Sequence, residues 1–99
     1  MMSEEAKKYD ADKPDWTLLP ISAIISIIKV LEFGAKKYKR DQWKGVPDAR
    51  RRYLAAAFRH LGAVSDGEWL DSESGLPHIA HSACCLLFLL WFGNDEVKT

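Results

Sequence analysis

The segment that most constrains the fold is HIAHSACCLLFLLWFG, residues 78–93, which would be apolar on nearly every side of a helix. A helix with one apolar stripe can lie on a surface, whereas a helix that is apolar all round has to be buried. The apolar run from Ser82 to Phe92 is too short to cross a bilayer, which requires about 20 residues. We therefore predict the central helix of an all-α protein, packed by its own chain and by a partner, with no membrane contact.

Two further segments have apolar residues at the i, i+3, i+4, i+7 spacing that is typical of amphipathic helices. The first begins after Pro20, a residue that suits the first turn of a helix. Its Ile-rich stretch also fits a strand, but its length and spacing favour a helix. The second follows Pro47 and ends before Gly67. The predicted elements are an irregular lead-in at residues 1–19 and helices at about 20–38, 47–65 and 76–92.

The length of the chain bounds how much apolar surface it can bury alone. Its 99 residues suffice for one small domain, expected to cover residues 1–99. Hydrophobic residues make up 47% of the sequence, which is more apolar material than three helices of a small monomer need to bury. We therefore expect a small helical bundle that is completed by oligomerisation, as a homodimer or a homotetramer.

The charges balance overall but are unevenly distributed. With 14 basic and 14 acidic residues, the net charge gives no support to nucleic-acid binding. Basic residues dominate residues 36–52, whereas residues 66–73 contain four acids and no base. These zones can bind an anion and a cation side by side, or they are two solvated faces. Nucleic-acid binding through the basic zone is the weakest of the functional hypotheses.

The two cysteines indicate the cellular compartment. Cys84 and Cys85 are adjacent in an apolar helix, so their side chains point to different faces and cannot easily bridge each other. They are typical of buried free thiols in a reducing compartment. The first ten residues are polar and do not have the pattern of a signal peptide. We expect a cytoplasmic protein.

The three histidines of the chain are predicted to meet at one end of the bundle. His60 lies on the last turns of the second helix, while His78 and His81 share one face of the first turns of the third. Because the two helices are expected to be antiparallel, the end of one lies beside the start of the next. A single histidine there is most simply a packing residue. Three histidines beside an acidic loop favour a metal or acid–base site, with carboxylates from Glu68, Asp71 and Glu73.

The chemistry of such a site suits a phosphate substrate. Carboxylates hold Mg²⁺, whereas imidazole prefers Mn²⁺ or Zn²⁺, so the sequence leaves the metal open. A divalent cation would clamp phosphate oxygens and activate water, with His60 or Glu68 as the proton acceptor. Arg59 and Lys37 can add positive charge to the phosphate clamp. Trp43 is either a stacking surface for a base or a hydrophobic plug.

Two blocks of the sequence resemble a known family. FGAKKYKRDQW and RHLGAVSDGEWLDSESGLPHIAH are similar to signature blocks of the N-terminal domain of phage and bacterial dATP/dGTP diphosphohydrolases, a family related to MazG-like nucleotide pyrophosphatases. YDADKPDWTLLP resembles the family's opening block, so the similarity runs from about Tyr9 to Phe92. The resemblance implies an all-α oligomer that hydrolyses a nucleoside triphosphate, here a purine dNTP, to the monophosphate and pyrophosphate. It also implies a Mg²⁺ or Mn²⁺ cofactor.

The resemblance also bears on individual residues. MazG-like enzymes carry E-x-x-D where His78 and His81 stand. The resemblance therefore leaves three roles open: the loop carboxylates hold the metal, the histidines hold it, or the histidines contact phosphates as cations. Gln42 stands where the family has an asparagine, and Cys84–Cys85 stand where it has an aromatic–asparagine pair, which leaves the base preference open. These departures also keep open a non-catalytic nucleotide- or protein-binding module. The candidate residues are His60 and Glu68 for catalysis, Glu68, Asp71, Glu73, His78 and His81 for the metal, and Lys13, Lys37, Tyr38, Trp43 and Arg59 for the substrate.

Overall fold

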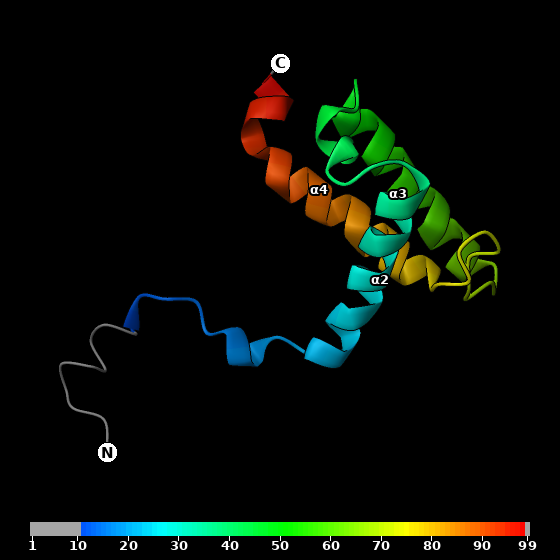
Figure 1. The fold of residues 1–99 in the computed structure, drawn as a ribbon, viewed down its shortest axis with the longest axis horizontal. Coiled ribbons are helices and arrows are strands. Elements are labelled where there is room, and N and C mark those ends of the chain that lie inside the picture. Colours follow the sequence, from blue (N-terminus) through cyan, green and yellow to red (C-terminus); the bar gives the residue numbers. More distant parts are fainter. Residues whose placement is uncertain (1–10, 99) are drawn as a thin grey trace.

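The structure is a computed structural model that describes residues 11–98, with side chains up to residue 93. Tyr9 and the other residues before position 11 lie outside this part. The described residues form helices joined by loops and contain no strand (Figure 1), which confirms the all-α prediction. The elements are the 3-10 helix η1 (Trp16–Leu18), α2 (Ile21–Lys37), the 3-10 helix η2 (Gln42–Gly45), α3 (Ala49–Ser65) and α4 (His78–Lys98).

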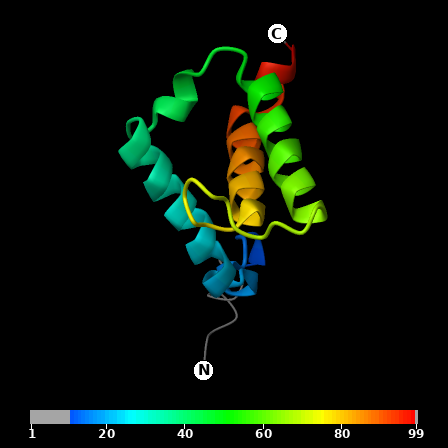
Figure 2. The same cartoon turned by 90° about the vertical axis from the view of Figure 1, so that its right-hand side faces the viewer.

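Helix α4 occupies the middle of the bundle. It packs against α3 as an antiparallel hairpin, and α2 lies on its other side (Figure 2). A small core joins α2 to α4 through Val30, Ala80 and Cys84. On the other side, the buried Ser82 hydroxyl of α4 donates to the carbonyl oxygen of Ala57 in α3 at 2.7 Å. Small side chains therefore allow α4 to approach both of its neighbours closely.

The helices begin and end close to the positions predicted from proline and glycine residues in the sequence. The carbonyl oxygen of Pro77 accepts the N–H groups of Ala80 and His81, so α4 begins directly after the proline. Gly93 has φ 65°, which interrupts the regular helix one residue after the predicted end. Helix α3 begins two residues later than predicted from Pro47, because Asp48 takes a left-handed conformation.

The single chain leaves much apolar surface uncovered. Leu90 of α4 is 78% exposed and Phe58 of α3 is 65% exposed, and Ile21 of α2 is also largely exposed. In the single chain only the sides of α4 that face α2 and α3 are covered, so the prediction that a partner completes its burial stays a prediction. None of the helices in the described residues is long and apolar enough to cross a membrane.

The predicted buried thiols are confirmed. Cys84 and Cys85 are both reduced and buried. The Cys84 sulfur lies 3.6 Å from the carbonyl oxygen of Ile27. Burial raises the pKa of the Cys84 thiol to about 12, so this side chain is a packing residue and not a nucleophile at neutral pH.

Candidate functional site

The structure brings the three histidines together at the end of the α3–α4 hairpin. His60 comes from the last turns of α3, and His78 and His81 come from the first turns of α4. The Nδ1 atoms of His60 and His78 are 2.8 Å apart. The rings of His60 and His81 stack with centroids 4.6 Å apart and an interplanar angle of 11°. The cluster therefore consists of three rings in direct contact.

The loop between the helices places Asp71 against this cluster. Backbone hydrogen bonds from Asp71 to Leu76 and from His78 to Trp69 close the loop at its base. Gly75 has φ 72°, a conformation that side chains disfavour, and its N–H donates to the carbonyl oxygen of Asp71. As a result, Oδ2 of Asp71 lies 3.7 Å from Nε2 of His81.

Three of these side chains form a group that fits a divalent cation. His60, Asp71 and His78 each offer a ligand atom, and these atoms lie within 4.8 Å of one another. Nε2 of His78 is buried and has no hydrogen-bond partner among the described residues. An unpartnered buried nitrogen is expected where a bound ligand completes the contacts. Two imidazoles and one carboxylate suit Mn²⁺ or Zn²⁺ better than Mg²⁺, which prefers oxygen ligands.

The ionisation of the cluster also favours a cation. Burial and the neighbouring histidines hold the pKa of His60 below its usual value. Burial also lowers the pKa of His81, against the opposing effect of Asp71. For Asp71, burial raises the pKa, but hydrogen bonds from Ser74 outweigh this effect and the pKa is lowered. At neutral pH His60 and His81 are therefore neutral and Asp71 is ionised, the forms in which these side chains bind metals.

These shifts predict a pH-dependent stability. His60 and His81 have lower pKa values when folded than when unfolded, so the unfolded chain binds more protons below about pH 6.5. We expect the free energy of unfolding of the metal-free protein to fall between pH 7.5 and pH 5.5, as measured by urea denaturation in the presence of a chelator. The His60→Gln variant should show a weaker pH dependence over this range. If the free energy of unfolding had the same pH dependence in both proteins, the lowered pKa of His60 would be contradicted.

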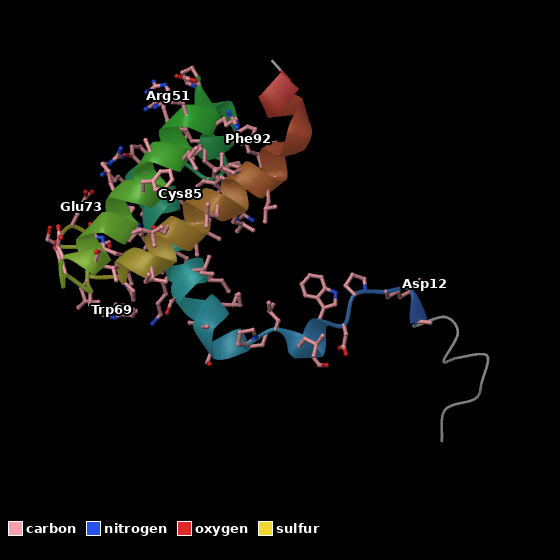
Figure 3. The ribbon with its side chains drawn as sticks, turned by 180° about the vertical axis from the view of Figure 1, so that it is seen from behind. Asp12, Arg51, Trp69, Glu73, Cys85 and Phe92 are labelled. Carbon is pink, nitrogen blue, oxygen red and sulfur yellow. The ribbon has the colours of Figure 1, made fainter. Side chains whose placement is uncertain are left out.

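Two predicted site residues pair with each other beside the cluster. Glu73, a predicted metal ligand, forms an ion pair with Lys37, a predicted substrate contact. The hydrogen bond from Lys37 to Glu73 raises the pKa of Lys37. Glu73 does not belong to the group formed by His60, Asp71 and His78. Figure 3 shows Glu73 at the loop end of the hairpin, opposite Arg51 and Phe92.

Glu68, predicted both as a base and as a ligand, lies at the edge of the cluster. Its side chain is 55% exposed, and its Oε1 atom lies 3.6 Å from the buried Nε2 of His78. This carboxylate therefore touches both the histidine cluster and the solvent, a position that suits proton exchange with water.

Trp43 lies at the other end of α4. Its ring stacks on Phe88 with centroids 4.1 Å apart and also contacts the edge of Trp91. Tyr53 donates its hydroxyl proton to the Trp43 carbonyl oxygen. Phe88 is ten residues beyond His78 in the sequence, so it lies about 15 Å further along the helix. In the single chain Trp43 has the contacts of a hydrophobic plug, the second of its two predicted roles.

The remaining predicted substrate contacts are not gathered at the histidines. Arg59 is exposed and precedes His60 in α3. Tyr38 is 61% exposed at the end of α2, where the ammonium group of Lys37 lies 5.3 Å from its ring centroid. Lys13 is exposed on the lead-in, which extends away from the helices (Figure 1). Of this group, only Arg59 adjoins the cluster in the single chain.

Ser74 is a site residue that the sequence reasoning missed. Its hydroxyl contacts both Asp71 and His81, at 2.9 Å and 2.7 Å. Serine is common in turns, so its position in the loop does not by itself indicate a site residue. The available signal was the spacing Asp71-x-x-Ser74, since an aspartate often binds the N–H and hydroxyl groups of residues that follow it in a turn.

These features define an all-α protein whose helical hairpin carries a histidine–carboxylate cluster. Residues 3–99 match the family described as dATP/dGTP diphosphohydrolase, N-terminal, and the chain belongs to this family. A dATP/dGTP diphosphohydrolase of Salmonella phage PMBT28 is 33% identical over 89 residues, which cover 90% of this chain and 30% of the relative. No solved structure matches the chain. The predicted family is confirmed, and its relation to MazG-like enzymes stays a prediction.

Proposed function

We propose that this chain hydrolyses a purine deoxynucleoside triphosphate to the monophosphate and pyrophosphate with the help of a divalent cation. The observation that carries the proposal is the convergence of His60, Asp71 and His78 on one point of the hairpin. The substrate class comes from the family and from the printed name of the phage relative. Because the chain spans 30% of that relative, the activity of the whole relative is carried over here as a proposal.

The cation would be held by His60, Asp71 and His78. When bound, it would neutralise phosphate charge and make water a stronger acid. The two imidazoles favour Mn²⁺ over Mg²⁺. Since both the His60 ring and the Asp71 carboxyl have lowered pKa values, they keep their metal-binding forms below neutral pH.

The remaining residues of the site would move a proton and bind phosphate. Glu68 is the better-placed proton acceptor, because its carboxylate faces solvent while the Nδ1 atom of His60 is engaged with His78. Arg59 is exposed beside His60 and offers a guanidinium group to phosphate oxygens. Catalysis would then consist mainly of positioning and charge neutralisation, as is usual in phosphoryl chemistry.

The test is an assay of the purified chain with each dNTP and NTP in Mn²⁺ or Mg²⁺. Anion-exchange chromatography separates the nucleotide products, and an enzymatic assay quantifies pyrophosphate. We expect equal amounts of pyrophosphate and of dAMP or dGMP, with higher rates in Mn²⁺. Release of a nucleoside diphosphate and orthophosphate would exclude the proposed bond cleavage. Absence of turnover with every nucleotide would exclude the activity from this chain.

A second candidate function is nucleotide binding without hydrolysis. It is favoured by the departures from the family pattern at Gln42 and at Cys84–Cys85. In that case the same nucleotides and cations would raise the melting temperature of the chain, but no monophosphate would form. The two measurements on one preparation therefore separate the two functions.

We further propose that a second copy of the chain covers the apolar side chains left exposed on α2, α3 and α4. They include Ile21 of α2, Phe58 of α3 and Trp91 of α4, which are 60%, 65% and 56% exposed. Several large apolar side chains left exposed on one small domain are typical of a surface that binds another protein chain. Light scattering should give a mass of two or four times 11.2 kDa. A mass of 11.2 kDa at micromolar concentration would contradict self-association.

A further inference from the structure

We infer that Ser74 is a positioning residue that fixes His81 as the tautomer with its proton on Nε2, so that His81 orients the site and does not bind the cation through Nε2. The inference rests on the proposed function in that it assigns a role within the same site. It concerns a hydrogen-bond arrangement that exists before any cation or nucleotide binds.

The Ser74 hydroxyl has three partners. Its oxygen lies 2.9 Å from Oδ2 of Asp71, 2.7 Å from Nε2 of His81 and 3.2 Å from the backbone nitrogen of Leu76. A hydroxyl group donates one proton and accepts two hydrogen bonds. The three contacts therefore fill its complete hydrogen-bonding capacity, and the role of each partner can be worked out.

Two of the partners have fixed roles. The backbone N–H of Leu76 can only donate, so it uses one of the lone pairs of Ser74. The Asp71 carboxylate is ionised at neutral pH and can only accept, so it takes the single hydroxyl proton. The contact with His81 must then use the second lone pair of Ser74. Nε2 of His81 is therefore the protonated nitrogen.

The opposite tautomer would leave a hydrogen bond unmade. If Nε2 of His81 carried no proton, the one hydroxyl proton of Ser74 would have to serve both His81 and Asp71. One of the two contacts, at 2.7 Å and 2.9 Å, would then bring two lone pairs together. All three side chains are at least partly buried, so water cannot fully replace the missing donor.

The tautomer determines what His81 can do. Its Nε2 atom is occupied by Ser74, and its only lone pair is on Nδ1. The group of converging ligand atoms accordingly consists of His60, Asp71 and His78 without His81. The His81 ring stacks on His60 and meets the edge of Phe33 at 6.3 Å and 88°. His81 thus holds the ring of His60 in place, while Ser74 joins it to Asp71.

The test uses nitrogen NMR of the histidine rings in metal-free protein at pH 7.5. Long-range ¹H–¹⁵N spectra distinguish the protonated ring nitrogen from the unprotonated one. We expect His81 in the wild type to have a protonated Nε2 whose proton exchanges slowly enough with water to be observed. Ser74→Thr, which keeps the hydroxyl, should preserve this signal, and Ser74→Ala should lose it. Ser72→Ala is the matched control, since Ser72 is an exposed serine of the same loop.

An unprotonated Nε2 in the wild type would overturn the inference, and so would an unchanged Nε2 proton signal in Ser74→Ala.

A second measurement follows Mn²⁺ binding by electron paramagnetic resonance without nucleotide. Loss of a partner that orients metal ligands costs roughly 10–100-fold in affinity, so we expect a loss of this size in Ser74→Ala and none in Ser72→Ala. Equal Mn²⁺ affinity in both variants would remove the positioning role. If hydrolysis is absent but both results hold, the inference stands and the proposed function fails.

Discussion

Replacement of Asp71 by asparagine is expected to lower cation-dependent nucleotide hydrolysis at least about 100-fold, because loss of an outer partner of a metal ligand alone costs up to roughly that amount. The asparagine side chain has nearly the same shape and keeps an oxygen that can accept the hydrogen bonds from Ser74. What it removes is the only negative charge in the group formed with His60 and His78. The loss of activity would therefore measure how much the negative charge of the Asp71 carboxylate contributes to hydrolysis.

Asp66→Asn is the matched control for this variant. Asp66 is an exposed residue just after α3, at the start of the same loop, and it does not belong to the histidine cluster. We expect Asp66→Asn to keep wild-type values of kcat/KM and Mn²⁺ affinity. Circular dichroism should show the same helix content for both variants. Activity of Asp71→Asn within about threefold of the control would exclude Asp71 as a cation ligand.

Replacement of Ala57 by leucine is expected to have the largest effect on stability. Ala57 is 2% exposed, and its carbonyl oxygen accepts a 2.7 Å hydrogen bond from Ser82 of the neighbouring helix. A larger side chain here has to push α3 away from α4. Overpacking of this kind costs about 1–3 kcal/mol. The melting temperature should fall by roughly 4–8 °C for each kcal/mol, as measured by thermal unfolding.

Ala35→Leu separates overpacking from the general effect of a larger apolar side chain. Ala35 is exposed in α2, so its replacement by leucine should change stability by less than about 0.5 kcal/mol. Ala57 lies one turn before His60 in α3, so separation of the helices should also move His60 away from His78. We expect weaker Mn²⁺ binding in Ala57→Leu even below its melting temperature. A normal melting temperature for Ala57→Leu would contradict the close packing of the hairpin.

The sequence predicted the helices and the position of the histidines well. Helical spacing marked α2 and α3, a continuous apolar run marked α4, and prolines marked the beginnings of all three helices to within about two residues. Since α3 and α4 were expected to pack as an antiparallel hairpin, the last turns of α3 had to lie beside the first turns of α4. This simple geometry was enough to place His60 against His78 and His81.

The loop could not be predicted in the same way, because its side-chain directions depend on turn geometry. Glu73 and Asp71 are two positions apart, but Glu73 pairs with Lys37 while Asp71 faces the histidines. A serine in a turn, such as Ser74, gives no sign in the sequence of a contact like the one with His81. Trp43 was ambiguous because its stacking on Phe88 depends on how the α2–α3 connection crosses α4.

The loop described above also bears on how this protein folds. Asp71, Ser74, His78 and His81 are close in the sequence, and the backbone hydrogen bonds that close the loop join Asp71 to Leu76 and His78 to Trp69. Contacts between near neighbours lose little chain entropy and form early in folding. We expect the α3–α4 hairpin to assemble before α2 docks. A cation that binds this early structure would then accelerate folding more than it slows unfolding.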